Sequence, residues 1–247
     1  ILDAALYGGT ILGGGGGGDA KKGRKYAKLA VEYADLRLLS AEDLDDNDMV
    51  LTASLVGAPN AENQFMTPAD LVKTFVLLQR NCDFPVAGII TNEQGGEGNG
   101  KRMASGSTFS DFPLWIFPGN WPPPPTGVMG SMNLHKIADI RRCRPVLEEI
   151  RKQAAMWNVF FEGSIEHTSK LVRLASIEAG GLVAVARNPV SVSYAKENGA
   201  PGGVQFAIET GKAFLKGLDA SVEEGVKELC GFLKGRYLQK VRWRNFH

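Results

Sequence analysis

The chain has few of the residues from which disulfide frameworks and fixed metal sites are built. Among its 247 residues are three cysteines, Cys82, Cys143 and Cys230, and three histidines. An odd number of widely spaced cysteines argues against a disulfide framework and favours a reducing compartment. We therefore expect a cytoplasmic protein. Neither a Cys-x-x-Cys nor a His-Glu-x-x-His pattern occurs, so the sequence carries no recognisable preset zinc site.

An excess of charge of one sign and long apolar runs are also missing. The 28 basic and 27 acidic residues leave a formal net charge of +1, whereas nucleic-acid-binding proteins usually carry a strong basic excess. No apolar stretch approaches the roughly 18 residues that span a bilayer. We therefore expect neither nucleic acid nor membrane among the partners. The hydrophobic content of 44% is ordinary for a folded globular chain.

Six consecutive glycines, Gly13 to Gly18, stand between two segments with helical apolar spacing. Because both flanks have an apolar face, we expect an ordered turn between two packed helices rather than a linker. Free backbone amides ahead of a helix can bind an anion, so Gly15, Gly16 and Asp19 are candidate substrate-binding residues. A close-packing turn that Asp19 caps fits the pattern equally well. No Gly-Lys-Ser/Thr follows, so the run is not a Walker A loop.

Short apolar strands alternate with helices along the rest of the chain. The predicted strands are Met49–Val56, Val86–Thr91 and Leu182–Ala186. Thr67 followed by Pro68 predicts a helix start, and "SIEHTSKLVRLASIEAGG" predicts a helix that a double glycine ends. Two further helices are expected over roughly Gly203–Leu218 and Val222–Leu233. The alternation favours an α/β fold with a largely parallel sheet, because uninterrupted apolar strands are typical of sheets covered on both faces.

Polar and glycine-rich segments follow the three predicted strands. In open α/β sheets, ligands bind beyond the carboxyl ends of the strands. We therefore predict one pocket there, in which Glu62 and Glu93 serve as general bases or metal ligands. The predicted substrate-binding residues of these segments are Asn60, Asn92, Gly95, Gly96, Asn99, Arg187 and Asn188. Ordinary turn chemistry explains any one such segment equally well, and the three together favour a site.

Histidine offers one further catalytic candidate. His135 follows a proline-rich loop and is retained as a candidate acid or base. His167 lies within a predicted helix, and we expect it at the surface or supporting another residue. Neither Ser131 nor Cys143 has a base partner in the pattern, so no nucleophile is predicted. The cofactor is left open, a divalent metal being one candidate.

Several motifs together resemble one family, the S-methyl-thiohydantoin desulfurase-like proteins, in their N-terminal domain. The matching segments are "GGTILGGGGGGD", "LDDNDMVLTASLVGAPNAEN", "IITNEQGGEGN", "PTGVMGSM", "GGLVAVARNPV" and "GAPGGVQFAIETGKAFL". The resemblance implies a three-layer α/β sandwich and kinship with hydrolases that open or desulfurise hydantoin-like rings. Most members continue into a β-rich second domain. We accordingly expect an α/β N-terminal domain over residues 1–235, with residues 236–247 as the start of a truncated or absent second domain.

One segment departs from the family pattern. Where the resemblance leads us to expect an acid, a cysteine, an arginine and a histidine, the chain has "IFPGNWPPP" at Ile116–Pro124. Asn120 is retained there and is counted among the predicted substrate-binding residues. Two hypotheses follow: a hydrolase acting on a small cyclic amide or thioamide, or a non-catalytic binding or assembly subunit of the same fold. The apolar residues near the end of the chain, such as Trp243 and Phe246, favour a homo-oligomer.

Overall fold

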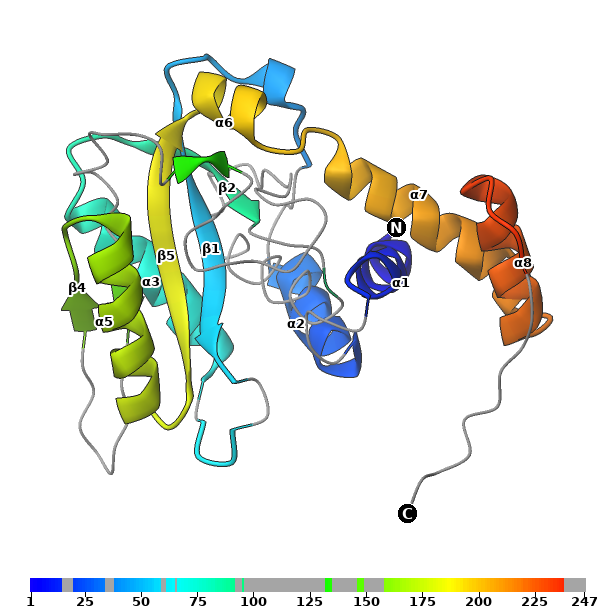
Figure 1. Cartoon of the computed structure of the whole chain (residues 1–247), viewed down its shortest axis with the longest axis horizontal. Helices are drawn as coiled ribbons and strands as arrows, with labels where there is room; N and C mark the ends of the chain where they lie inside the picture. Colours follow the sequence, from blue (N-terminus) through cyan, green and yellow to red (C-terminus); the bar gives the residue numbers. More distant parts are fainter. Residues whose placement is uncertain are drawn as a thin grey trace.

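The computed structural model describes residues 1–14, 20–33, 38–58, 61–64, 66–91, 95, 132–134, 146–148 and 158–237. Within them, helices and strands combine into a mixed α/β fold (Figure 1). The described strands lie together, whereas α1, α2, α7 and α8 gather to one side of them (Figure 1). Among the described helices, none combines the length and the apolar character needed to cross a bilayer.

The described strands form one five-stranded sheet in the order β2-β1-β5-β3-β4. Their bounds are β1 Met49–Gly57, β2 Val86–Thr91, β3 Val146–Glu148, β4 Asn158–Phe160 and β5 Leu182–Ser191. Only the pairing of β1 with β2 is parallel, and the three other described pairings are antiparallel. The prediction of a largely parallel sheet is therefore wrong for these strands. Apolar composition reports that both faces of a strand are covered, and it says nothing of the direction of its neighbour.

Helices pack against both faces of the central strands. On one face, Leu51 and Ala53 of β1 form a cluster with Phe75 and Leu78 of α3 (Pro68–Arg80). On the other face, Val183 and Val185 of β5 form a cluster with Val172 of α5 (Ile165–Glu178). Because successive side chains of a strand point to opposite faces, these clusters lie on opposite sides of the sheet.

The predicted helix starts and stops are confirmed where the structure describes them. Thr67 and Asp70 form a capping box at the start of α3, with Pro68 as its first residue. The Ser164 side chain accepts a hydrogen bond from the His167 amide at the start of α5. That helix ends before Gly180 and Gly181, whose φ angles of +88° and +109° favour glycine. The remaining helical elements are α1 Leu2–Leu12, α2 Ala20–Tyr33, the short 3-10 helix η1 Ala41–Asp43, α6 Val192–Asn198, α7 Gly203–Leu218 and α8 Val222–Phe232.

Glycines allow α1 and α7 to cross with their backbones almost touching. A Cβ added at Gly8 would lie 1.7 Å from the carbonyl oxygen of Ala207, and one added at Gly211 would lie 1.9 Å from that of Ala4. Ala4, Ala5, Val204 and Ile208 are buried around this crossing. The two helices that flank the glycine run are thus present, with α1 packed against α7. Gly13 and Gly14 form a turn, and the rest of the run lies outside the described residues.

The last central strand is longer than predicted. The sequence predicts a strand over Leu182–Ala186, whereas β5 continues through Arg187, Asn188 and Pro189 to Ser191. Proline has no amide donor, so within sheets it is confined to edges, strand starts and bulges. Here the pairing register of β1 with β5 shifts between Val50 and Thr52, so the proline lies at a bulge. Residues 238–247 lie outside the described part of the chain, and the second domain stays a prediction.

Candidate functional site

Most of the predicted site residues lie outside the part of the chain that the structure describes. They are Gly15, Gly16, Asp19, Asn60, Asn92, Glu93, Gly96, Asn99, Asn120 and His135, and their roles stay predictions. Four predicted residues are described: Glu62, Gly95, Arg187 and Asn188. Arg187 and Asn188 are almost wholly buried, with exposed fractions of 5% and 2%, whereas Glu62 is exposed in a turn.

The Glu62 turn packs against the start of β5. The amide of Ala58 donates a hydrogen bond of 2.7 Å to the carbonyl oxygen of Gly181. A Cβ added at Gly180 would lie 2.0 Å from the carbonyl oxygen of Asn63, so the backbone of the turn packs closely against the double glycine. Glu62 is therefore held near Leu182, the first residue of β5.

Arg187 and Asn188 lie in the middle of β5 and not at its end. Gly57 pairs with Leu182 and Thr52 pairs with Arg187, five positions further along each strand. At about 3.3 Å per residue, roughly 16 Å of strand separates the Glu62 turn from Arg187. The expectation that both share one pocket is wrong, because β5 runs antiparallel to β1 and its carboxyl end lies at the opposite edge of the sheet.

Four buried polar side chains meet on the paired strands β1 and β5 instead. We call Thr52, Ser54, Arg187 and Asn188 the β1–β5 polar cluster; their exposed fractions are 0%, 4%, 5% and 2%. Thr52 is the direct cross-strand neighbour of Arg187. Ser54 lies two residues beyond Thr52, so both hydroxyls belong to the same face of β1.

The polar cluster divides the apolar core on that face of the sheet. Val50 belongs to one buried apolar cluster with Ile90 and Val190. Val56 packs against another, which contains Val183 and Val172. Thr52 and Ser54 stand between Val50 and Val56 on the same face. A strand that only needed to be stable would carry apolar side chains at these two positions.

The bulge places Asn188 in a backbone conformation that few residues adopt. Asn188 has φ +54°, in the left-handed region, and it lies between the pairs Thr52–Arg187 and Val50–Val190. Asparagine visits this region more readily than most residues because its side chain can form local hydrogen bonds. Bulges are over-represented next to active sites, where they re-aim a side chain.

Three groups of the cluster have unused hydrogen-bonding capacity. Thr52 Oγ1, Ser54 Oγ and Asn188 Nδ2 are buried and have no hydrogen-bond partner among the residues described. Burying such a group without a partner costs about 1–3 kcal/mol. Other buried hydroxyls of the chain are paired: Thr74 donates to the carbonyl of Leu71, and Thr210 to that of Phe206. Among the described residues, the hydroxyls of the cluster therefore differ from Thr74 and Thr210 in having no partner.

The predicted loop after β2 begins beside the polar cluster. Thr91, the last residue of β2, pairs with Ala53, which lies between Thr52 and Ser54. Glu93 follows two residues later in the sequence and lies outside the described residues. The described end of β2 thus lies beside Ala53, whereas the Glu62 turn lies at the end of the strand pair where Gly57 pairs with Leu182.

Metal ligands and perturbed carboxylates are not part of the cluster. In the described ranges, no three His, Cys, Asp or Glu side chains come together as a metal site would require. Among the described residues, the resolved pKa shifts belong to two lysines away from the sheet interior, the half-buried Lys196 and the exposed Lys227. The hydrogen bond that the Lys196 ammonium donates to Asp46 raises the pKa of Lys196, and Glu42 raises it further. Glu224 raises the pKa of Lys227 in the same way, with a smaller effect from Glu223.

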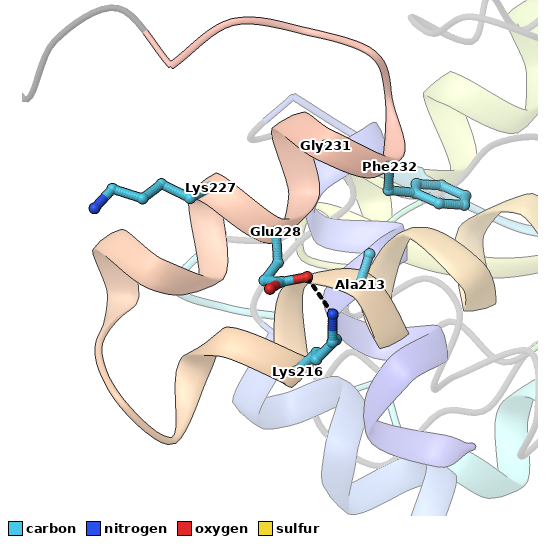
Figure 2. A pocket seen from close by; sticks show the side chains of 6 residues that line it. All are labelled: Ala213, Lys216, Lys227, Glu228, Gly231 and Phe232. Atoms are coloured by element: carbon cyan, nitrogen blue, oxygen red, sulfur yellow. Dashed lines mark hydrogen bonds and ion pairs between the residues drawn. The ribbon is translucent and has the colours of Figure 1, made fainter.

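A separate pocket of about 460 Å³ lies between α7 and α8 (Figure 2). Its lining residues are Ala213, Lys216, Lys227, Glu228, Gly231 and Phe232. The Lys216 ammonium and the Glu228 carboxylate are 2.7 Å apart, and Lys227 points away from them (Figure 2). Exposed ion pairs of this kind contribute little binding energy. No residue predicted from the sequence lines this pocket, so the β1–β5 polar cluster is the better candidate site.

Sequence reasoning missed Thr52 and Ser54. The apolar residues of "LTASLV" predict a buried strand, yet two hydroxyl side chains occupy alternate positions in it. That alternation was the available signal, since a strand side chain recurs on the same face every second residue.

Comparison with known proteins adds a family match over part of the chain and a similar fold. Residues 2–114 match the family described as S-Me-THD-like, N-terminal domain, which confirms the resemblance over that segment. No curated protein matches the sequence. The crystal structure of a protein from Chromobacterium violaceum is similar, with a TM-score of 0.73 and 17% identity over 94% of this chain. This chain covers 65% of that one, under two thirds, and at such identity the likeness shows the fold alone.

Proposed function

We propose that this chain, which carries an S-Me-THD-like N-terminal domain over residues 2–114, is a hydrolase that acts on a small cyclic amide or thioamide. Hydantoin and thiohydantoin rings are the substrate class that the family suggests. The observation that carries the proposal is the unused hydrogen-bonding capacity of the β1–β5 polar cluster. Its β1 half lies inside the matched segment, and its groups are suited to the carbonyl and N–H groups of such a ring.

Glu93 is the base in this proposal. Hydrolysis at a ring C=N, C=S or C=O carbon needs a base to activate water and donors to stabilise the developing negative charge. Glu93 follows the end of β2 beside Ala53, whereas Glu62 is exposed and held roughly 16 Å along the strands from Arg187. We assign the oxyanion donors to the backbone amides of Gly95 and Gly96, and the binding of the ring to Asn188 and Arg187. The proposal leaves a divalent metal open.

Turnover of defined rings tests the proposal. The purified full chain is incubated with hydantoin, 2-thiohydantoin and S-methyl-thiohydantoin while ring opening, sulfide and methanethiol are followed. Glu93→Gln is expected to lower kcat by at least about 100-fold, as loss of a general base does. Glu62→Gln is the matched control and should retain activity. Absence of turnover by the unaltered chain, or equal activity of Glu93→Gln, would contradict the proposal.

A second candidate function is a binding or assembly subunit with the same site. It is favoured by "IFPGNWPPP" at Ile116–Pro124, which replaces the acid, cysteine, arginine and histidine expected from the family resemblance. Calorimetry separates the candidates, because a binding subunit would bind the ring without opening it. If the chain is a binding subunit, introducing cysteine, arginine and histidine into that loop is expected to create ring-opening turnover, provided that the variant still folds.

We further propose that the domain as a whole is a three-layer sandwich and that it works in the cytoplasm as a homo-oligomer with a small-molecule substrate. Helices on both faces of the central strands support the first point. The few cysteines support a cytoplasmic location, and the apolar residues near the end of the chain, such as Trp243 and Phe246, support the homo-oligomer. Sedimentation of the full chain tests the oligomer: a monomer at micromolar concentration would contradict it.

A further inference from the structure

We propose that Thr52 and Ser54 are specificity-determining residues that bind the cis-amide edge of the ring, one hydroxyl at its carbonyl oxygen and the other at its N–H. The inference rests on the proposed function and deepens it, because it names the part of the substrate that the site recognises. Both residues belong to β1 and were not among the residues predicted from the sequence.

The two hydroxyls are buried and unpartnered at once. Thr52 Oγ1 and Ser54 Oγ have no hydrogen-bond partner among the residues that the structure describes, and their side chains are 0% and 4% exposed. Two such groups together oppose folding by about 2–6 kcal/mol. Replacement by valine and alanine would remove this cost at nearly the same volume. Their presence is therefore better explained by a bound group than by packing.

Their spacing selects a two-atom edge rather than a single atom. Residues two apart on one strand are about 6.7 Å apart. One atom that bonds two hydroxyls spans only about 5.6 Å between them. The oxygen and nitrogen of a cis amide are separated by about 2.2 Å, so an edge of this kind spans roughly 8 Å and reaches both hydroxyls.

The chemistry of the hydroxyls matches an edge that contains both a donor and an acceptor. A hydroxyl can donate one hydrogen bond and accept others. The pair can therefore donate to a carbonyl oxygen and accept from the neighbouring N–H. Asn188 Nδ2, on the adjoining strand, adds a further buried donor for a second carbonyl of the ring.

Calorimetric titration of the full chain with three probes tests this inference. Hydantoin presents cis-amide edges, 1,3-dimethylhydantoin keeps the ring and carbonyls without any N–H, and succinate presents carboxylates. We expect hydantoin to bind at least about tenfold more tightly than the dimethyl compound. Thr52→Val and Ser54→Ala should each weaken hydantoin binding about tenfold. The variant that loses the hydroxyl at the N–H should bind the dimethyl compound like the unaltered chain, whereas the variant that loses the hydroxyl at the carbonyl oxygen should bind it more weakly.

Thr74→Val is the matched control variant. Thr74 is buried to the same degree, with 2% exposed, but it lies on α3 on the opposite side of the sheet and is paired with Leu71. It should bind hydantoin like the unaltered chain. Urea unfolding verifies that each variant is folded. Equal hydantoin affinity in Thr52→Val and Ser54→Ala, or an equal loss in Thr74→Val, would overturn the inference.

The remaining outcomes separate this inference from the hydrolase proposal. Hydantoin that binds through Thr52 and Ser54 without turnover would support the inference and contradict the hydrolase. Turnover that is insensitive to both substitutions would support the hydrolase and overturn the inference. Succinate that binds in the same hydroxyl-dependent way while hydantoin does not would also overturn it, because the pair would then recognise carboxylates.

Discussion

The crossing of α1 and α7 and the pairing of β1 and β5 are both buried, yet they are built on opposite principles. At the helix crossing, glycines bring the backbones together and leave no room for a further atom at Gly8 or Gly211. Aromatic rings pack beside it, with the centroids of Tyr7 and Phe214 5.5 Å apart. At the strand pairing, buried hydroxyl and amide groups remain without partners among the described residues.

The two regions also differ in whether their buried polar groups are hydrogen-bonded. On α1 and α7, the hydroxyls of Thr10 and Thr210 donate to the carbonyls of Leu6 and Phe206 at 2.8 and 2.7 Å. None of the unpartnered buried atoms in the described ranges belongs to α1, α7 or α8. Proteins retain costly polar groups and rare backbone conformations where function requires them. The difference supports a stabilising role for α1 and α7, and it supports our proposal that the strand pair recognises a ligand.

The largest effect is expected from filling the helix crossing. Gly8→Val would place its Cβ on the carbonyl oxygen of Ala207, now 1.7 Å from the ideal position, and α1 would have to leave α7. We expect a loss of more than about 3 kcal/mol in the free energy of unfolding, measured by urea denaturation.

Gly231→Ala is the control for that substitution. Gly231 lies inside α8, and a Cβ there would meet no atom within 4 Å. The alanine should raise the free energy of unfolding by about 0.5–1 kcal/mol. Equal stability of Gly8→Val and the unaltered chain would show that the crossing is not tight.

The bulge at Asn188 gives the next largest effect. Asn188→Val puts a β-branched residue at φ +54° and should cost about 1–3 kcal/mol of unfolding free energy. Asn188→Gly keeps the backbone conformation and removes only the amide. It should unfold at nearly the same urea concentration and bind hydantoin about tenfold more weakly. If Asn188→Gly binds hydantoin as tightly as the unaltered chain, the Asn188 side chain does not contribute to binding.

Two substitutions in the β1–β5 polar cluster are expected to raise the free energy of unfolding instead of lowering it. Thr52→Val and Ser54→Ala remove buried hydroxyls that have no partner in the described part of the chain, so each should raise the free energy of unfolding by about 1 kcal/mol in the absence of ligand. Thr210→Val, on the helix side, removes a hydroxyl that is bonded to Phe206 and should not stabilise the chain. Thermal unfolding of the three variants compares them directly. Destabilisation by Thr52→Val would mean that its hydroxyl is satisfied within the protein.

Local signals in the sequence predicted much of the fold but little of the site. Capping by Thr67, the double glycine after α5 and the bounds of α7 follow from short-range chemistry, and the structure confirms them. The direction of β5 depends on how a distant strand pairs, which no local pattern encodes. That direction places Arg187 opposite Thr52 and far from Glu62. Glu62 and Arg187 therefore do not lie together at the strand ends, although the sequence predicts that they do. Asn188 was selected as a turn residue and lies in a bulge, where asparagine is favoured for the same backbone reason.

The smallest effect concerns the exposed ion pairs that hold α6 to the segment before β1. Lys196 Nζ lies 2.8 Å from Asp46 and 3.4 Å from Glu42, and the hydrogen bond to Asp46 raises the pKa of this lysine above its ordinary value of 10.5. A raised pKa in the folded state means that the stabilisation is present in full below pH 10.5 and is lost as pH rises through the folded-state pKa. Exposed pairs of this kind are weak and screened by salt. We expect Lys196→Met to lower the urea midpoint slightly at pH 8, and we expect this difference to shrink as the pH rises above 10.5 through the folded-state pKa, because the lysine of the unaltered chain then loses its charge. A difference that persists unchanged at the higher pH would assign the effect of Lys196 to the packing of its aliphatic stem and not to its charge.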